Sequence, residues 1–160
     1  MKYLITGGAG FIGSSYAHAL LERGEEVIIF DNFSRNGSTS NLDWLKSSKK
    51  GTLQIIQGEI RHDHKELLKH IKKVDVVIHL AAQVAVTTSV QNPREDFEIN
   101  AIGTFNVLEA ARQSKKNPVI LYSSTNKVYG DLTHSEIIEE KLRYSFKNLP
   151  DFSKYLIDDN

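Results

Sequence analysis

One stretch at the start of the chain decides its fold: Lys2-Tyr3-Leu4-Ile5-Thr6-Gly7-Gly8-Ala9-Gly10-Phe11-Ile12-Gly13. Residues 2–6 are mainly apolar and predict a short buried strand, which runs into a glycine-rich turn. Residues 14–23 have helical periodicity, and Gly24 marks the end of that helix. Residues 26–30 predict a second strand that ends on Asp31. Residues 2–31 therefore predict the strand–turn–helix–strand unit that opens a dinucleotide-binding fold.

The glycines of the turn have separate physical roles. Gly7 and Gly8 allow a tight turn out of the strand, where a Cβ atom would clash. Gly10 leaves room for a pyrophosphate against the backbone, and Gly13 lets the helix pack close to the strand. The helix then offers unpaired N–H groups and a partial positive charge to the phosphates.

Asp31 follows Gly13 by 18 residues (13 to 31), close to the ~20 expected for the acid that binds a ribose 2′-hydroxyl. A carboxylate accepts hydrogen bonds from a diol and repels a 2′-phosphate, which favours NAD over NADP. The nearby Arg35 softens that preference. The alternative is a glycine turn beside an ordinary acidic strand end, but the strand, helix and spacing together favour dinucleotide binding.

Composition narrows the class of protein. The 160 residues are 40% hydrophobic and 25% charged, which is ordinary for one globular domain. Twenty basic residues balance twenty acidic ones, so nothing favours nucleic acid or an anionic membrane as a partner. There is no cysteine, which excludes disulfides and thiolate metal sites. No apolar run approaches ~18 residues, and none resembles a signal peptide, so we expect no membrane span and a cytoplasmic location.

The rest of the chain alternates strands and helices. Strands are predicted over residues 53–57, 75–80 and 118–122, and helices over 41–45, 63–71 and 93–115. Asn41 or Ser40 is expected to cap the first of these helices, and Asp63 with Glu66 has the spacing of a capping box for the second. This alternation predicts an α/β fold: a Rossmann-type doubly wound parallel sheet of about five strands, with helices on both faces.

The helix predicted over 93–115 begins at a proline and has two apolar faces. One face carries Phe97, Ala101, Leu108 and Ala111, and the nearly opposite one carries Ile99, Ile102 and Ala110. A helix that is apolar on two sides needs two partners. We expect the first face to pack on the sheet and the second to be offered to a partner. The strand over 118–122 is expected to leave an open apolar edge.

Several polar residues have two readings. The hydroxyls of residues 123–125 follow a central strand and either face the ligand crevice of an open α/β sheet or only cap the strand end. His62 and His64 have no third ligand in reach and are expected to be solvated loop residues, so no metal site is predicted. His79 lies in an apolar strand and is expected to be a hydrogen-bonded core residue.

Five motifs occur in one order along residues 1–130. They are the glycine turn 6–13, Asp31-Asn32, His79-Leu80-Ala81-Ala82, Asn100-Ala101-Ile102-Gly103-Thr104 and the run 123–130. Together they resemble the extended short-chain dehydrogenase/reductases, that is, the NAD-dependent epimerase/dehydratase family. Within that family, residues 125–131 look most like the CDP-tyvelose (CDP-paratose) 2-epimerases. The resemblance implies NAD as the cofactor.

The resemblance also implies roles at the cofactor site. The glycine turn would bind the pyrophosphate, with backbone groups of Phe11 and Ile12. The residues that would hold the adenosine ribose are Asp31, Asn32, Ser34, Arg35 and Asn36. Glu59 and Ile60 stand where the family has an Asp and an aliphatic residue beside adenine. The cofactor wall would be Leu80, Ala81, Ala82 and Gln83, braced by Asn100.

Thr125 matches the family's catalytic Ser/Thr, which hydrogen-bonds the sugar hydroxyl that is oxidised, and Ser124 would help to position the sugar. The family's base is the Tyr of a Tyr-x-x-x-Lys pair, whose Lys lowers the pKa of the phenol. The residues four positions after the six tyrosines are Gly7, Leu20, Asn126, Thr133, Asn148 and Asp159, so none is a lysine.

We therefore expect a NAD-binding Rossmann domain over residues 1–130 and an irregular or part-helical extension over 131–160, cut before the Tyr-x-x-x-Lys helix and the substrate domain. The expected function is the N-terminal NAD-binding part of a nucleotide-sugar epimerase, inactive alone, whose full-length form binds a nucleotide-diphosphate sugar and is a homodimer. The alternatives are a nucleotide-sugar 4,6-dehydratase fragment, which an Asp-Glu pair in place of Asn126-Lys127 would favour, and a non-catalytic NAD-binding module. Which sugar and which carbon are involved stays open.

Overall fold

The computed structural model describes residues 1–125, 128 and 136–148. They belong to two compact units, Met1–Ser123 and Ser124–Asn160, and each unit is treated separately. The predicted Tyr129-Gly130 end of the last motif, together with Asn126 and Lys127, lies outside the described residues.

The first unit confirms the predicted parallel sheet. Its strands are β1 (Lys2–Thr6), β2 (Glu26–Asp31), β3 (Thr52–Gln57), β4 (Val76–His79) and β5 (Val119–Tyr122). They lie in the order β3-β2-β1-β4-β5, and every neighbouring pair is parallel. Because β1 lies between β2 and β4, the carboxyl ends of three strands meet around Thr6, where the strand order reverses. Such a switch point is where open α/β sheets bind ligands.

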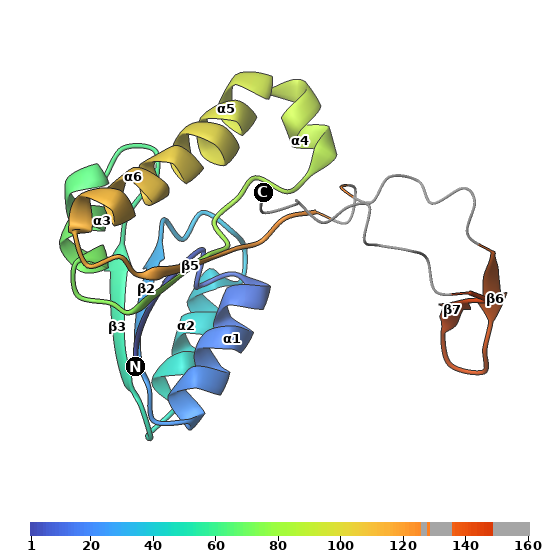
Figure 1. Cartoon of the computed structure of the whole chain (residues 1–160), viewed down its shortest axis with the longest axis horizontal. Coiled ribbons are helices and arrows are strands. Elements are labelled where there is room, and N and C mark those ends of the chain that lie inside the picture. The colour runs from blue at the N-terminus through green and yellow to red at the C-terminus, as the bar shows by residue number, and fades with distance from the viewer. Residues whose placement is uncertain (126–127, 129–135, 149–160) are drawn as a thin grey trace, which may run out of the picture. The chain divides into compact units, whose positions relative to one another are not determined.

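Helices cover both faces of the sheet (Figure 1). On one face, α1 (Phe11–Glu22) and α2 (Ser38–Lys46) pack on Ile5 and Ile29. On the other, α3 (His64–Ile71) and α6 (Thr104–Ser114) pack on Leu4 and Ile28. Adjacent residues of one strand thus feed opposite cores, as the two-residue period of a strand requires. This is why residues 27–30 of β2 and 76–78 of β4 are continuously apolar.

Two local predictions are corrected, and one helix was not predicted. The helix α2 begins at Ser38 rather than at residue 41, after Gly37 in a left-handed conformation (φ 89°). The Asp63 carboxylate does not cap α3, because it instead accepts the N–H of Glu59 at 2.7 Å. A short helix, α4 (Val86–Gln91), follows β4 and was not predicted.

The predicted helix 93–115 consists of α5 (Pro93–Phe97), the π-helical turn η1 (Glu98–Gly103) and α6. Its faces are not those predicted. Phe97 is 58% exposed and Leu108 is 47% exposed, whereas Ala110 is fully buried. The buried side of η1 and α6 is instead formed mainly by Gly103, Val107, Ala110 and Ala111. Small residues allow α6 to lie close to the sheet and α3, while the larger apolar side chains stay outside.

The strand β5 lies at one edge of the sheet, as predicted, and Val119, Leu121 and Tyr122 are exposed. On the α1 side, a shallow apolar groove runs between this edge and α1. Its lining includes Tyr16 and Leu20 from α1, Val76 and Ile78 from β4, and Val119 and Leu121 from β5. Val76 and Ile78 are buried here, whereas Val119 and Leu121 at the edge are exposed.

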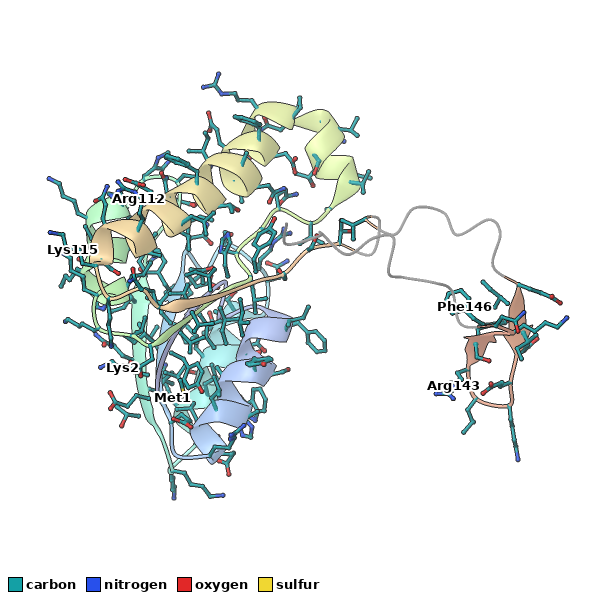
Figure 2. The ribbon with its side chains drawn as sticks, in the orientation of Figure 1. Met1, Lys2, Arg112, Lys115, Arg143 and Phe146 are labelled. Atoms are coloured by element: carbon teal, nitrogen blue, oxygen red, sulfur yellow. The ribbon has the colours of Figure 1, made fainter. Side chains whose placement is uncertain are left out.

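Charged side chains form ion pairs and hydrogen bonds at the amino ends of the strands. Asp75 accepts the backbone N–H of Lys2 at 2.8 Å and the Nζ of Lys116 at 2.9 Å. Figure 2 shows Met1 and Lys2 at this edge, where the Lys2 ammonium pairs with Glu26 at 3.0 Å. These ion pairs lie at the opposite end of the strands from the glycine turn.

In the second unit, β6 (Ile137–Glu139) and β7 (Tyr144–Phe146) form an antiparallel hairpin. The part-helical structure expected within the extension 131–160 is therefore absent from residues 136–148, which the structure describes. Glu136 pairs with Lys147 at 2.9 Å and Glu140 with Arg143 at 3.1 Å across this hairpin. In the part of the chain that is described, no helix is both long enough and apolar enough to span a membrane.

Candidate functional site

The glycine turn lies directly after β1, and two glycines in it are required by the geometry. Gly7 has φ 69°, and a Cβ atom there would lie 2.7 Å from the Ala81 nitrogen. A Cβ atom on Gly13 would lie 2.3 Å from the Gly7 carbonyl oxygen. The turn, the start of α1 and the segment after β4 thus approach as closely as backbones can. Phe11 and Ile12 begin α1, and their side chains are exposed. Because α1 starts just after the carboxyl end of β1, its first-turn N–H groups lie at the carboxyl edge of the sheet.

Asp31 joins the turn to the loop after β2. Its Oδ2 accepts the N–H of Ala9 at 3.0 Å, and its Oδ1 accepts the N–H of Phe33 at 2.8 Å. Phe33 has the left-handed φ of 58° that few non-glycine residues adopt, and this contact helps to hold it. Each carboxylate oxygen keeps further lone pairs with which it can accept a hydroxyl. The turn and the acid predicted from spacing are therefore brought into direct contact.

A second side chain, Asn41, also binds the glycine turn, although a different role was predicted for it. The Asn41 side chain, expected to cap α2, donates from Nδ2 to the carbonyl oxygen of Ala9 at 2.8 Å. The N–H of Ala9 is thus bound by Asp31 and its carbonyl oxygen by Asn41. Only the polarity of Asn41 next to a predicted loop hinted at such a contact.

Asn32 and Glu59 lie side by side at the ends of β2 and β3. The Asn32 Nδ2 donates to Glu59 at 2.8 Å, and the Arg61 guanidinium donates to the same oxygen at 3.0 Å. Burial raises the pKa of Glu59, but the hydrogen bonds from Arg61 and Asn32 outweigh it and leave the pKa below its ordinary value. Glu59 is therefore a carboxylate at neutral pH. Ile60, predicted beside adenine, has its side chain in the core at 4% exposure.

The loop after β2 reaches across the sheet to the segment after β4. The Arg35 Nη2 donates to the Gln83 Oε1 at 2.8 Å. Because β1 lies between β2 and β4, this hydrogen bond joins the segments that follow the two strands on either side of β1. Ser34 donates its N–H to Asn32 at 3.0 Å, and Asn36 is exposed in the same loop.

The segment Leu80–Gln83 is braced by Asn100, as predicted for that residue. The Asn100 Oδ1 accepts the Gln83 N–H at 2.9 Å, and its Nδ2 donates to the Gln83 carbonyl oxygen at 3.1 Å. Asn100 lies in η1 and also donates to Asp96 at 3.1 Å. Leu80 packs toward the core, Ala81 lies against the turn and Ala82 is exposed.

His79 is a hydrogen-bonded core residue, as predicted, and is 2% exposed. Its Nδ1 lies 2.6 Å from the Thr6 hydroxyl, and its Nε2 lies 2.9 Å from the Thr104 hydroxyl. Burial lowers the pKa of His79 to about 4. The two threonines were not predicted as its partners, although Thr6 precedes the glycine turn and Thr104 ends the Asn100 motif.

The predicted catalytic hydroxyls continue the chain after β5. Ser123 donates its side-chain hydroxyl to the His79 carbonyl oxygen at 3.3 Å. Ser124 and Thr125 are exposed and open the second unit. The Thr125 carbonyl oxygen accepts the N–H of Val128 at 3.2 Å. Their roles therefore stay predictions. Among the described residues, no group of three or more His, Asp or Glu side chains is arranged to hold a metal ion.

Comparison with known proteins agrees with this arrangement. The family described as GDP-mannose 4,6 dehydratase matches residues 4–154. The CDP-paratose 2-epimerase of Salmonella typhi is 49% identical over 152 residues, which are 94% of this chain and 44% of that protein. A putative UDP-glucose 4-epimerase of Methanocaldococcus jannaschii is 37% identical over 85% of this chain and 42% of its own length. The chain thus spans less than half the length of these two relatives.

Solved structures share the fold. A UDP-glucose-4-epimerase from Stenotrophomonas maltophila, with bound NAD and formylated UDP-arabinopyranose, has a TM-score of 0.74 at 30% identity. The match covers 84% of this chain and 40% of that one. The UDP-glucose 4-epimerase of Thermus thermophilus in complex with NAD has a TM-score of 0.70 at 35% identity, over 88% of this chain and 43% of that one.

Proposed function

Because the chain belongs to the GDP-mannose 4,6 dehydratase family of NAD-dependent epimerases and dehydratases, we propose that it binds NAD at the carboxyl edge of its sheet. The observation that carries this proposal is the contact of Asp31 with the N–H of Ala9, which brings the acid and the glycine turn together. The solved structures of the Stenotrophomonas maltophila and Thermus thermophilus epimerases both contain NAD.

The residues present suit the parts of this cofactor. The pyrophosphate would lie on the glycine turn, near Gly10 and Gly13 and the N–H groups that open α1. Asp31 would accept hydrogen bonds from the adenosine ribose, while Asn32, Ser34, Arg35 and Asn36 line the same loop. Leu80–Gln83 would form the wall on the other side. Glu59, already hydrogen-bonded to Asn32, would lie beside the adenine.

Asp31 supports a preference for NAD over NADP, since its charge repels a 2′-phosphate. Arg35 is the residue that would weaken this preference. Its guanidinium is hydrogen-bonded to Gln83, away from the Asp31 carboxylate's own partners, Ala9 and Phe33. The preference is therefore expected to persist.

We further propose that the chain is the N-terminal NAD-binding part of a nucleotide-sugar epimerase similar to CDP-tyvelose 2-epimerases. The 49% identity to CDP-paratose 2-epimerase supports this choice over a 4,6-dehydratase, with which the identity is 32%. Asn126-Lys127 in place of an Asp-Glu pair agrees with it. The nucleotide-diphosphate sugar as substrate, the homodimer and the cytoplasmic location expected from the sequence are parts of this proposal.

In such an enzyme the cofactor supplies reversible hydride acceptance at one sugar carbon. Thr125 would hydrogen-bond the hydroxyl on that carbon and Ser124 would help to orient the sugar. Neither residue can act as the base, because the pKa of an alcohol is far too high. No tyrosine among the 160 residues has a lysine four positions on. A missing general base typically costs ~10²–10⁴-fold in rate, so the chain alone is expected not to turn over sugar nucleotides.

A chimera tests the function. The 152 aligned residues of the Salmonella typhi enzyme are replaced by the matching part of this chain, and epimerisation of CDP-sugars is followed by NMR. The proposal predicts activity that Thr125→Val abolishes and Thr125→Ser retains. A chimera that binds NAD but eliminates water from the sugar would favour the dehydratase. A folded chimera with no activity on CDP-, UDP- or dTDP-sugars would favour the non-catalytic module.

A further inference from the structure

The ring of His79 lies between two hydroxyl groups from distant parts of the chain. Thr6 ends β1 immediately before the glycine turn, and Thr104 follows η1 at the start of α6. The two contacts, 2.6 Å to Nδ1 and 2.9 Å to Nε2, use both ring nitrogens. The ring is thus the only group of the described residues that hydrogen-bonds to both of these threonines through its side chain.

The positions of the protons in this cluster follow from what each atom can accept. The Thr104 hydroxyl lies 2.7 Å from the Asn100 carbonyl oxygen, which can only accept, so its proton points there. The Thr104 oxygen must then accept a proton from Nε2–H of His79. Nδ1 keeps its lone pair and accepts the Thr6 hydroxyl proton. The Thr6 oxygen in turn accepts the N–H of Ala81 at 3.3 Å.

These bonds form one directional chain, from the Ala81 N–H through Thr6, His79 and Thr104 to the Asn100 carbonyl oxygen. The Asn100 side chain then holds both the N–H and the carbonyl oxygen of Gln83. The same ring therefore fixes the beginning and the end of residues 81–83. Because the Ala81 backbone lies against Gly7, a displacement of residues 81–83 would also displace the glycine turn.

We propose that His79 is a positioning residue which, as the neutral Nε2–H tautomer, holds residues 81–83 in place and thereby sets the affinity for the cofactor. The inference rests on the proposed function only in taking NAD as the ligand. A protonated ring would have two donors, and the Thr6 hydroxyl proton would lose its acceptor. Burial keeps the ring neutral well below neutral pH, because it lowers the pKa of His79 to about 4.

The tautomer can be observed without a ligand. In the cofactor-free protein at neutral pH, ¹⁵N NMR of the His79 ring should show an unprotonated Nδ1 and a protonated Nε2. The assignment is made by comparison with His79→Gln. A protonated Nδ1, or rapid exchange between the two tautomers, would overturn the proposal.

A pair of substitutions tests the positioning. Thr104→Val keeps the shape and removes the hydroxyl, whereas Thr104→Ser keeps the hydroxyl. We expect Thr104→Val to speed amide exchange at Gln83 and to weaken NAD binding, measured by calorimetry, about 3- to 30-fold. Thr104→Ser should leave both within about twofold. The Ile28 amide in β2 is the internal reference for global stability.

Each possible result of the Thr104 experiment either supports or overturns the role proposed for His79. Faster exchange and weaker binding in Thr104→Val alone, with Ile28 unchanged, support the proposal. Unchanged values in Thr104→Val, equal effects in both variants, or equal acceleration at Ile28, overturn it. If the wild type binds no NAD, the proposed cofactor fails, while the tautomer and the exchange at Gln83 still decide whether His79 holds residues 81–83.

Discussion

At the scale of single residues, Asp31 combines two tasks. Its carboxylate holds the N–H of Ala9 in the glycine turn and the N–H of Phe33 in the next loop. It therefore shapes the site whether or not a ribose is present. Its position at the strand end was predicted from spacing, because the glycines and the acid lie in one local unit.

The charge of Asp31 is expected to select the cofactor. Asp31→Asn keeps the side chain's size and one acceptor oxygen but removes the repulsion of a 2′-phosphate. We expect the affinity for NADP relative to NAD to rise about tenfold. Calorimetric titration with both cofactors gives this ratio. Asp43→Asn, on the exposed surface of α2, is the control, and an unchanged ratio in Asp31→Asn would refute the role assigned to its charge.

Other residues of the site could not be predicted from the sequence. The contacts of Asn41 with Ala9 and of Thr6 with His79 join positions 32 and 73 residues apart. Asn41 begins one predicted helix and Thr104 lies inside another, and nothing in the local sequence distinguishes their long-range contacts from ordinary polar positions of a helix. Their partners follow only from how the helices pack.

At the scale of elements, the helix after Pro93 shows a limit of periodicity. Its two apolar faces were recognised, but the face with Phe97 and Leu108 was predicted to pack on the sheet, and both of these side chains are exposed. The side that is buried carries Gly103, Ala110 and Ala111. Close packing on α3 and the sheet favours small residues, which a scale of hydrophobicity ranks low.

The edge strand β5 is expected to cause self-association of the 160-residue chain. It pairs on one side only with the described residues of the chain, and Leu121 is 46% exposed beside an apolar groove. Leu121→Lys should shift the chain toward monomer in sedimentation experiments over a range of concentrations. Val90→Lys, on exposed α4, should not. A wild type that is monomeric throughout, or equal effects of both substitutions, would contradict this expectation.

At the scale of the whole molecule, the alternation of apolar strands and helices was sufficient to predict the five-stranded parallel sheet. Parallel strands buried on both faces are apolar throughout, and their connections need helices, so the pattern has few solutions. The hairpin β6–β7 was not predicted because its strands have only three residues each. Such short strands leave no periodicity to recognise.

Buried His79 should make the stability of the fold depend on pH. Its pKa in the folded protein, about 4, lies below the ordinary 6.5, so between these values the unfolded chain binds the extra proton. The free energy of unfolding should therefore fall as the pH is lowered from 6.5 toward 4, by up to about 3 kcal/mol. Urea unfolding at several pH values measures it. His79→Gln should flatten this dependence and His62→Gln, at the surface, should not; equal slopes in the wild type and His79→Gln would contradict the assignment.

A calorimetric titration of the chain with NAD⁺ tests for a dinucleotide site at the glycine turn. The wild type should bind it at one saturable site. Gly13→Ala should lose this binding while remaining folded, because the added Cβ would lie 2.3 Å from the Gly7 carbonyl oxygen and displace the turn. Ser15→Ala, an exposed position of α1, should bind as the wild type does. No binding by the folded wild type, or equal binding by Gly13→Ala, would contradict a dinucleotide site at the glycine turn.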